Sequence, residues 1–481
     1  MNRRDPCAPS SASLRSRRHR ALPHFEGLEG RALMAVVFNQ VGDVLTITGD
    51  NLANTITVND NGTNAANNVT ASGGGSNFAS NSTVHEVRIN GLGGNDIINY
   101  RLANLILGSN RRISINSGLG DDRVTVTAGN LNSPLTLITD LGAGADSFAG
   151  TSGPITSSAA SVTVLGNTGN DSIRYTNNGV IRSDAFGAAS LFVRADGSLG
   201  DDTINVANQG TAIDGAAVNF FSDAGAGNDR VNFTNRAAVT SRTFGSVGRA
   251  ASMNMNVAGG LGDDTIALFQ GGSLSGATSN LTATGSAGRD QISVSTAGDV
   301  SAVAGFAAPA VAMTADGGAD NDGVTVRMNG KLQAGNLTAR GQGGTGDDRM
   351  LYVQAGDIGI ATSAVNMDGG AGDDIMTSNH SGKLQSLTST VLLVMQGGLG
   401  ADNITSNVNL SAGSSGKVGD AGSTALVDGG AGNDTLNFGV RIGAGSSTAV
   451  TAREDGGLGT DTGRHTANVS TSSLATDTVI P

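Results

Sequence analysis

A glycine- and aspartate-rich nonapeptide recurs fourteen times along the chain of 481 residues, and its spacing restricts the fold more than any other feature. Clear copies lie at residues 259–266 (GGLGDDTI), 369–374 (GGAGDD) and 429–436 (GGAGNDTL). The sixth position of each copy is an aspartate: Asp96, Asp122, Asp146, Asp171, Asp202, Asp229, Asp264, Asp290, Asp322, Asp348, Asp374, Asp402, Asp434 and Asp461. The intervals between them average about 28 residues, a period typical of stacked repeats that contact only their neighbours.

Each copy joins two strand-like segments through a tight turn. Runs such as residues 87–90, 162–164, 191–194 and 391–395 precede copies of the motif. The fourth position is Gly in all copies except one, which has Asp320, and Gly permits the positive φ of a tight turn. The eighth position is apolar in all copies except the last, which has Gly463, and it should point inward on the following strand. The remaining ten to fifteen or so residues leave room for one more strand and two looser corners.

We therefore predict an all-β fold, a right-handed parallel β-helix with three sides, about 27–28 residues per coil and one Gly-Asp turn per coil. The fourteen aspartates should stack along a single edge. The long intervals from Asp229 to Asp264 and from Asp290 to Asp322 should contain corner insertions. The expected segments are a basic leader (1–35, disordered or processed), an N-terminal cap with a degenerate first coil (36–90), the β-helix (91–465) and a C-terminal tail (466–481).

The composition agrees with a thin core that is repeated from coil to coil. The chain has 73 Gly, 7 Pro, no Trp and only 3% aromatic residues, fewer large side chains than a globular core of this length would need. Its one cysteine, Cys7, excludes an intramolecular disulfide, so a metal is the expected alternative staple. No run of eighteen apolar residues occurs, and we expect no membrane span.

The charge of the chain is unevenly distributed. Residues 1–35 carry a net charge of +4, which leaves −16 on the remainder of a chain whose total is −12. An acidic body of this kind is a poor binder of nucleic acid.

A column of stacked aspartates has an electrostatic cost. Neighbouring strands lie about 4.8 Å apart. Two like charges at that spacing repel by about 0.9 kcal/mol in water and by about 3.5 kcal/mol at an effective dielectric of 20. The column must therefore bind cations, raise the pKa of its carboxyl groups, or splay its turns.

Additional acidic and amide residues surround the predicted column. The fifth position is Asp or Asn in ten copies, and seven acids directly precede the first position: Asp140, Asp196, Asp223, Asp316, Asp368, Asp428 and Asp455. A single copy is ordinary turn chemistry, but fourteen copies in step indicate metal binding. Oxygen ligands without His or Cys nearby favour Ca²⁺, which accepts six to eight oxygens, over Mg²⁺.

Residues 91–463 resemble the hemolysin-type calcium-binding repeat (RTX) family. The resemblance implies a parallel β structure that folds on calcium after export. It also implies that turn carbonyls and the fourteen sixth-position aspartates are the ligands. The chain departs from the tandem family layout because one motif, rather than two, fills each coil. The copies with Leu141 at the first position and Arg289 at the fifth are expected to bind weakly, and Arg289 could replace a cation with its own charge.

Two further segments bear on localisation. Residues 17–20 (RRHR) and 25–35 (FEGLEGRALMA) resemble the N-terminal LExRxLMA segment of planctomycete surface and secreted proteins. No apolar stretch of seven residues precedes this segment, so it is not an ordinary signal peptide, and a simple basic arm is the alternative. Residues 474–480 are similar to C-terminal signals of type I export. We expect an extracellular or bacterial cell-surface protein.

These features together predict a secreted or cell-surface calcium-binding module with a structural or adhesive role. Its expected partners are calcium and a cell-surface polysaccharide or protein, without nucleic acid. The insertions containing residues 243–245 and 306–309 are either partner contacts or solvated loops.

Two alternatives stay open. One is a β-helix polysaccharide lyase or hydrolase, which rests on fold analogy alone. None of the five histidines, His19, His24, His85, His380 and His465, has an evident nucleophile partner, and we expect His380 to be exposed and the protein not to be an enzyme. The other alternative is a calcium buffer or a component of a surface lattice.

Overall fold

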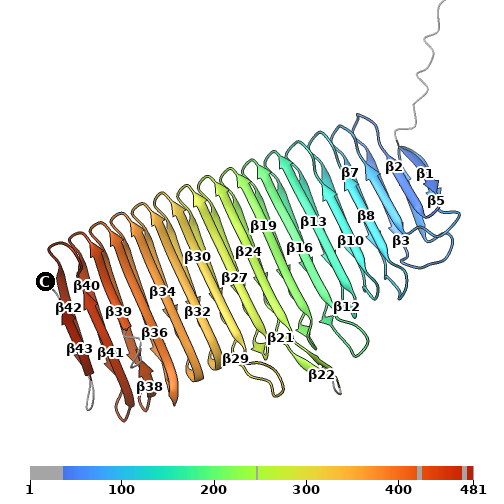
Figure 1. Ribbon diagram of the computed structural model, residues 1–481. Coiled ribbons are helices and arrows are strands. Elements are labelled where there is room, and N and C mark those ends of the chain that lie inside the picture. The colour runs from blue at the N-terminus through green and yellow to red at the C-terminus, as the bar shows by residue number, and fades with distance from the viewer. Residues whose placement is uncertain (1–35, 245–246, 420–424, 469–473, 480–481) are drawn as a thin grey trace, which may run out of the picture. The chain divides into compact units, whose positions relative to one another are not determined.

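The described part of the chain is a stack of parallel β-coils. The computed structural model describes residues 36–244, 247–419, 425–468 and 474–479. Its regular elements are 43 β-strands, and the described residues contain no helix. The strands form a β-solenoid of about 14 coils (Figure 1), so the predicted parallel β-helix is confirmed. The predicted leader, residues 1–35, lies outside the described residues, as do 469–473 and 480–481 of the tail.

Two parallel sheets form the broad sides of the stack. Sheet A contains β2 (Val44–Thr48), β6 (Glu86–Asn90), β8 (Arg111–Asn116), β10 (Leu135–Asp140), β13 (Ala159–Thr168), β16 (Ser190–Leu199), β19 (Ala217–Ala226), β24 (Ser252–Leu261), β27 (Thr278–Ala287), β30 (Ala310–Ala319), β32 (Leu332–Thr345), β34 (Ile358–Ala371), β36 (Gln385–Leu399), β39 (Ala425–Ala431), β41 (Ser447–Asp455) and β43 (Leu474–Val479). Sheet B contains β3 (Thr55–Asp60), β7 (Ile97–Leu102), β9 (Arg123–Ala128), β11 (Ser147–Ser152), β14 (Ser172–Asn177), β17 (Thr203–Asn208), β20 (Arg230–Asn235), β25 (Thr265–Gln270), β28 (Gln291–Thr296), β31 (Gly323–Met328), β33 (Arg349–Gln354), β35 (Ile375–Gly382), β37 (Asn403–Leu410), β40 (Thr435–Ile442) and β42 (Thr462–Asn468). From β6 onward, a Gly-Asp turn joins each sheet A strand to the sheet B strand that follows it.

The third side of the coil is much narrower than the other two. It consists of the two-residue strands β12 (Ile155–Thr156), β15 (Ile181–Arg182), β18 (Ala212–Ile213), β21 (Val239–Thr240), β26 (Leu274–Ser275) and β29 (Val300–Ser301). In later coils this side merges with the next sheet A strand, which is why β32 and β34 reach 14 residues and β36 reaches 15. A separate β38 (Ser415–Val418) pairs with β36 and β41. The expected three sides are therefore present but unequal.

The core follows from alternation along each strand. In β25, Ile266 and Leu268 are buried while the residues between them face outward. In β24, Met253, Met255 and Val257 are buried in the same way. Parallel register places each inward residue over its counterpart one coil away. A fully buried Val, Leu, Ile or Met side chain contributes about 1.5–3 kcal/mol to stability. The contributions of a thin core therefore add up over many coils.

Antiparallel strands close the N-terminal end of the stack. β1 (Val37–Val41) pairs with β2, and β4 (Val69–Gly73) pairs with both β3 and β5 (Ser76–Ala79). Beneath them lies a fully buried ion pair, in which Arg111 Nη2 donates to Asp60 Oδ1 at 2.9 Å. Tyr100 donates its hydroxyl to Asp60 Oδ2 at 2.7 Å. These donors satisfy the buried carboxylate at this end of the core.

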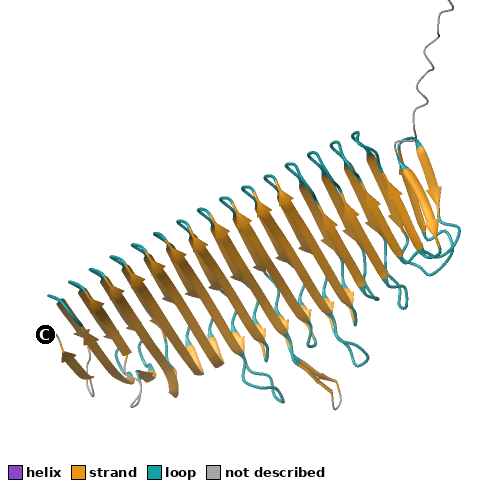
Figure 2. Ribbon diagram, turned by 45° about the horizontal axis from the view of Figure 1, so that its top comes forward, coloured by secondary structure: helices purple, strands orange, loops and turns teal. Residues whose placement is uncertain are grey.

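The corner insertions leave the stack on the side away from the Gly-Asp turns (Figure 2). The long interval after Asp229 contains an antiparallel hairpin, β22 (Arg242–Phe244) and β23 (Val247–Arg249). The interval after Asp290 contains a loop at residues 302–309. Both insertions were predicted from the spacing. A third loop, residues 183–189, carries Phe186, which is 97% exposed.

Candidate functional site

The fourteen sixth-position aspartates lie in line along one edge of the stack, where they form the aspartate ladder. Sheet B is in register from coil to coil, for example Thr265 with Gln291, so the residues just before these strands, Asp264 and Asp290, are stacked. Each ladder Oδ1 accepts a backbone N–H of the preceding coil, from Asn54 at Asp96 and from the preceding ladder aspartate at the others. For example, Asp229 N lies 2.8 Å from Asp264 Oδ1, and Asp264 N lies 2.8 Å from Asp290 Oδ1. The series continues without a gap to Asp461. The predicted alignment is confirmed.

The ladder points into the protein rather than into solvent. Thirteen of its fourteen side chains are buried, and Asp461 in the last coil is partly exposed. In all fourteen, the second carboxylate oxygen, Oδ2, is buried and has no hydrogen-bond partner among the described residues. A buried polar atom without a partner is costly, and a buried charge is more so. Each coil therefore needs a proton or a cation at this oxygen.

Burial raises the pKa values of the ladder carboxyl groups. The pKa is about 7 for Asp146, Asp202, Asp264, Asp322 and Asp374, and about 6 for Asp96, Asp171, Asp290, Asp348 and Asp402. Desolvation is the largest cause in each, and carboxylates nearby add to it in most of them. The backbone hydrogen bond at Oδ1 opposes the shift because it stabilises the charged form. Of the three outcomes expected for the column, splaying is excluded and raised pKa values are present.

The donor set around Oδ2 decides whether a cation suits the ladder. The described residues contain no cluster of three or more His, Cys, Asp or Glu side chains arranged to hold a metal. Backbone carbonyls therefore have to provide most of the ligands. A Cβ on Gly259 would lie 2.3 Å from Asp264 Oδ2 and 2.9 Å from the carbonyl oxygen of Gly285, so a carbonyl of the next coil lies close to this oxygen. Carboxylate and carbonyl oxygens are both ligands that Ca²⁺ accepts.

The same crowding explains the glycine at the first position of the motif. In the eleven copies with Gly there, a Cβ would come within 2.5 Å of the ladder Oδ2 of its own turn. In these copies Gly leaves room for Oδ2 and does not have a positive φ, whereas the other three copies have Ser117, Leu141 and Ala224 at this position. The glycine at the fourth position is different, because its φ is positive in every copy that has it, for example 120° at Gly262.

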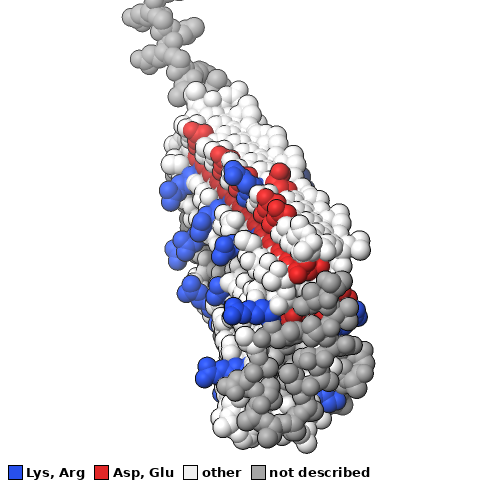
Figure 3. All heavy atoms as spheres, turned by 90° about the vertical axis from the view of Figure 1, so that its left-hand side faces the viewer, with Lys and Arg blue, Asp and Glu red and all other residues white. Residues whose placement is uncertain are grey.

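A second row of side chains runs along the exposed tips of the turns. Asp263 Oδ1 accepts the backbone N–H of Arg289 at 2.9 Å, and Asp347 Oδ1 accepts that of Asp373, also at 2.9 Å. These bonds run to the following coil, opposite in direction to those of the ladder. Figure 3 shows acidic side chains in a line along the long axis of the stack, with basic side chains on one flank. We call the ladder, this row and the acids that precede the first position the acidic edge.

The basic residue within the acidic edge makes an ion pair with its neighbour. Arg289 Nη2 lies 3.4 Å from Asp263 Oδ2, and both side chains are exposed. This is the position at which the sequence predicted that an arginine could stand in for a cation.

A buried amide ladder on the opposite corner was not predicted. Asn177 Nδ2 donates to Asn208 Oδ1 at 2.7 Å, Asn208 Nδ2 to Asn235 Oδ1 at 2.7 Å, and Asn235 Nδ2 to Gln270 Oε1 at 2.8 Å. All four side chains are fully buried. The sequence signal was an amide six residues after each of four consecutive ladder aspartates, Asp171, Asp202, Asp229 and Asp264. The satisfied amides hold neighbouring coils together and offer no free group for chemistry.

The histidines form no catalytic arrangement in the described part of the chain. The expectation that His380 is exposed is wrong: it is 2% exposed, and its ring lies 5.2 Å from that of Tyr352. Burial lowers its pKa to about 4, and neither ring nitrogen has a hydrogen-bond partner. His85 Nδ1 lies 3.5 Å from Asp43 at the surface. His19, His24 and the side chain of His465 are outside the described residues.

Comparison with known proteins adds no family to this description. No protein-family model matches the chain, and neither does any curated protein or solved structure. Within the described residues no helix could cross a membrane.

Proposed function

We propose that the protein is an extracellular or cell-surface module with a structural and adhesive role, stabilised by Ca²⁺ along its acidic edge. One observation supports this most directly: fourteen aligned ladder aspartates each have a buried oxygen without a partner. A divalent cation would satisfy these oxygens and offset the repulsion between stacked carboxylates. The resemblance of the leader to surface-protein segments supports the location.

The ladder Oδ2 atoms and turn carbonyls would hold the ion, which supplies positive charge in a region of low dielectric. Because the unfolded chain does not bring these groups together, binding would favour the folded state by mass action. The chain's own residues keep the ladder in place: Oδ1 stays bonded to the backbone of the preceding coil. The long flat sheets then provide a rigid surface for contact with other molecules.

The test is thermal unfolding, followed by circular dichroism, of the full chain in Ca²⁺, in Mg²⁺ and in EDTA. The expected result is a higher Tm in Ca²⁺ at near-millimolar concentrations, the range of extracellular modules. Equal Tm values in Ca²⁺ and EDTA would overturn the proposal.

A substitution can distinguish whether Oδ2 is satisfied by a cation or by a proton. The double variant Asp264→Asn/Asp374→Asn keeps the Oδ1 acceptor but removes the negative charge, so it should lose part of the calcium-dependent rise in Tm. The matched control is Asp299→Asn, since Asp299 also accepts an inter-coil backbone N–H, from Lys331 at 2.8 Å, away from the acidic edge. The control should keep the full rise. A double variant with an unchanged calcium response would show that the ladder is not the site.

A further inference from the structure

The outer face of sheet B carries basic residues and no acidic ones. No Asp or Glu occurs in any sheet B strand from β7 to β42. The outward positions and strand ends carry nine arginines, which we call the basic face: Arg101, Arg123, Arg174, Arg230, Arg236, Arg327, Arg349, Arg441 and Arg464. This face is unusual in a protein with a net charge of −12.

The arginines of the two sheets differ in their partners. On sheet A, Arg194 Nε lies 2.6 Å from Asp196, Arg453 lies 2.5 Å from Asp455, and Arg88 lies 2.8 Å from Glu86. None of the nine arginines of the basic face has a carboxylate within 4.0 Å among the described residues. An unpaired guanidinium offers a planar fork of donors that matches a carboxylate or a sulfate.

A hollow of about 400 Å³ lies in the middle of the basic face. It lies over β14, β17 and β20, where the small Ala207 stands in register between Thr176 and Thr234. Its lining is Arg174, Thr176, Asn205, Val206, Ala207, Gln209, Asn232, Thr234 and Arg236. The lining has two positive charges, three amides and two hydroxyl groups, and no negative charge.

The separation of the two arginines indicates an extended ligand. Arg174 and Arg236 are two coils apart and differ by four positions along the strand direction. That offset puts their Cα atoms roughly 16 Å apart at ordinary strand spacing and rise. Both arginines line the same hollow, and successive anionic groups of one extended chain could each contact one of the two guanidinium groups.

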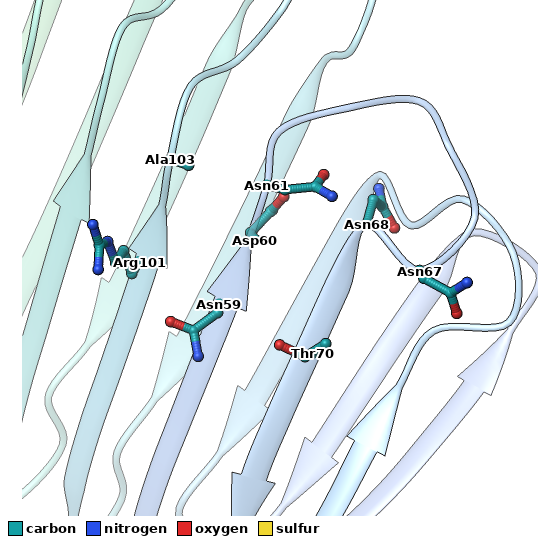
Figure 4. Close-up of a pocket in the computed structure, with 8 residues that line it drawn as sticks. All are labelled: Asn59, Asp60, Asn61, Asn67, Asn68, Thr70, Arg101 and Ala103. Carbon is teal, nitrogen blue, oxygen red and sulfur yellow. The ribbon is translucent and has the colours of Figure 1, made fainter.

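A second hollow, of about 280 Å³, lies near the N-terminal end of the same sheet (Figure 4). Arg101 on β7 and Asn59 on β3 lie on neighbouring strands beside it, and Asn61, Asn67 and Thr70 complete its polar rim. Its one acid, Asp60, is 2% exposed and is paired with Arg111. The chemistry of the first hollow therefore recurs at a second place on the face.

We propose that the basic face of sheet B binds an extended acidic polysaccharide, with arginines on its carboxylate or sulfate groups and Asn, Gln and Thr side chains on its hydroxyl groups. Single-stranded nucleic acid fits less well because its bases stack on aromatic side chains of the proteins that bind it. Phe269 is the one aromatic residue at a described outward position of β7–β42, and its ring folds over Gly271, where a Cβ would lie 2.7 Å from it.

This inference deepens the proposed adhesive role but does not depend on calcium, because neither hollow of the basic face is lined by a residue of the acidic edge. It is tested by titrating the full chain with polygalacturonate, heparin, neutral dextran and single-stranded DNA, with calorimetry as the readout. The first two should bind and dextran should not. Failure of the folded protein to bind either acidic polysaccharide would overturn the proposal. DNA binding at equal affinity would show general polyanion binding and would overturn it as well.

Paired variants with equal changes in charge locate the site. Arg174→Gln/Arg236→Gln should weaken binding at least tenfold, whereas Arg88→Gln/Arg194→Gln on sheet A should change it less than twofold. Equal losses in the two variants would show a non-specific charge effect and would reject the basic face.

The two proposals fail separately. Arg174→Gln/Arg236→Gln should keep the calcium-dependent rise in Tm, and Asp264→Asn/Asp374→Asn should keep polysaccharide binding. A protein that binds polysaccharide without any calcium response would retain this inference and lose the calcium proposal. The reverse result would retain only the calcium proposal.

Discussion

Asp264 Oδ1 accepts the backbone N–H of Asp229, which lies 35 residues earlier in the chain, at 2.8 Å. The adjacent Asp263 accepts the N–H of Arg289 in the following coil, at 2.9 Å. Two consecutive aspartates thus bind opposite neighbours, one buried and one exposed. The turn edge is held together by side-chain-to-backbone bonds between coils as well as by the two sheets.

The Asp264 bond should contribute to stability even without metal. Asp264→Ala leaves the buried N–H of Asp229 without an acceptor, which costs about 1–3 kcal/mol. Asp264→Asn keeps an acceptor at the same place and should cost less in EDTA. Chemical denaturation of both variants at neutral pH measures the difference, and an equal loss in the two would contradict the role of Oδ1.

In EDTA, the protein should lose stability as pH rises from about 4 to about 8. The folded pKa of Asp264 and Asp374 is about 7, above the usual value of about 3.9. The folded state therefore binds more protons in this range, and the stability they contribute is fully present below about pH 4 and is lost as pH rises through 7. Saturating Ca²⁺ should reduce this loss at pH 8. Unfolding curves at pH 5 and pH 8 test it, and greater stability at pH 8 in EDTA would contradict the prediction.

The titration of His380 should change stability with pH in the direction opposite to that of the ladder aspartates. Its folded pKa of about 4 lies below the usual 6.5, so the stability linked to the neutral ring is present above pH 6.5 and is lost as pH falls toward 4. His380→Met should reduce this acid sensitivity by roughly 2 kcal/mol at pH 5. Met328 occupies the corresponding strand position two coils earlier, so the core already accepts that side chain there. An unchanged pH dependence in the variant would show that His380 does not titrate in this range.

The fourth position of the motif offers a reciprocal pair of substitutions. Asp320 has a φ of 78° where other copies have Gly, so Asp320→Gly should stabilise the protein by about 1 kcal/mol. Gly262→Ala should destabilise it by about 3 kcal/mol, because a Cβ there would also lie 2.0 Å from the carbonyl oxygen of Gly227. Thermal unfolding compares the two variants, and changes in Tm of the same sign would contradict the preference for Gly at the fourth position.

Much of the architecture follows from the spacing of the motif. Because the motif recurs once per coil along the chain, parallel pairing must bring Asp264 over Asp290. The excess residues between Asp229 and Asp264 must then leave the coil as an insertion. Alternation also predicted that the eighth position of the motif points inward, and Ile266 at that position is buried. His380 was misplaced because the alternation from Met376 along β35, which turns it inward, was not applied to it.

The chemistry of the ladder and the basic face could not be predicted in the same way. Sequence alone determined the repeat, the coil and the row of aspartates, because these depend on local pattern and period. Only the tertiary structure decided that Oδ1 is bonded while Oδ2 is not, and that the third side is narrow. It also decided that nine arginines share one face and have no carboxylate partner among the described residues. Those properties depend on burial and on neighbours a full coil away, which no local pattern specifies.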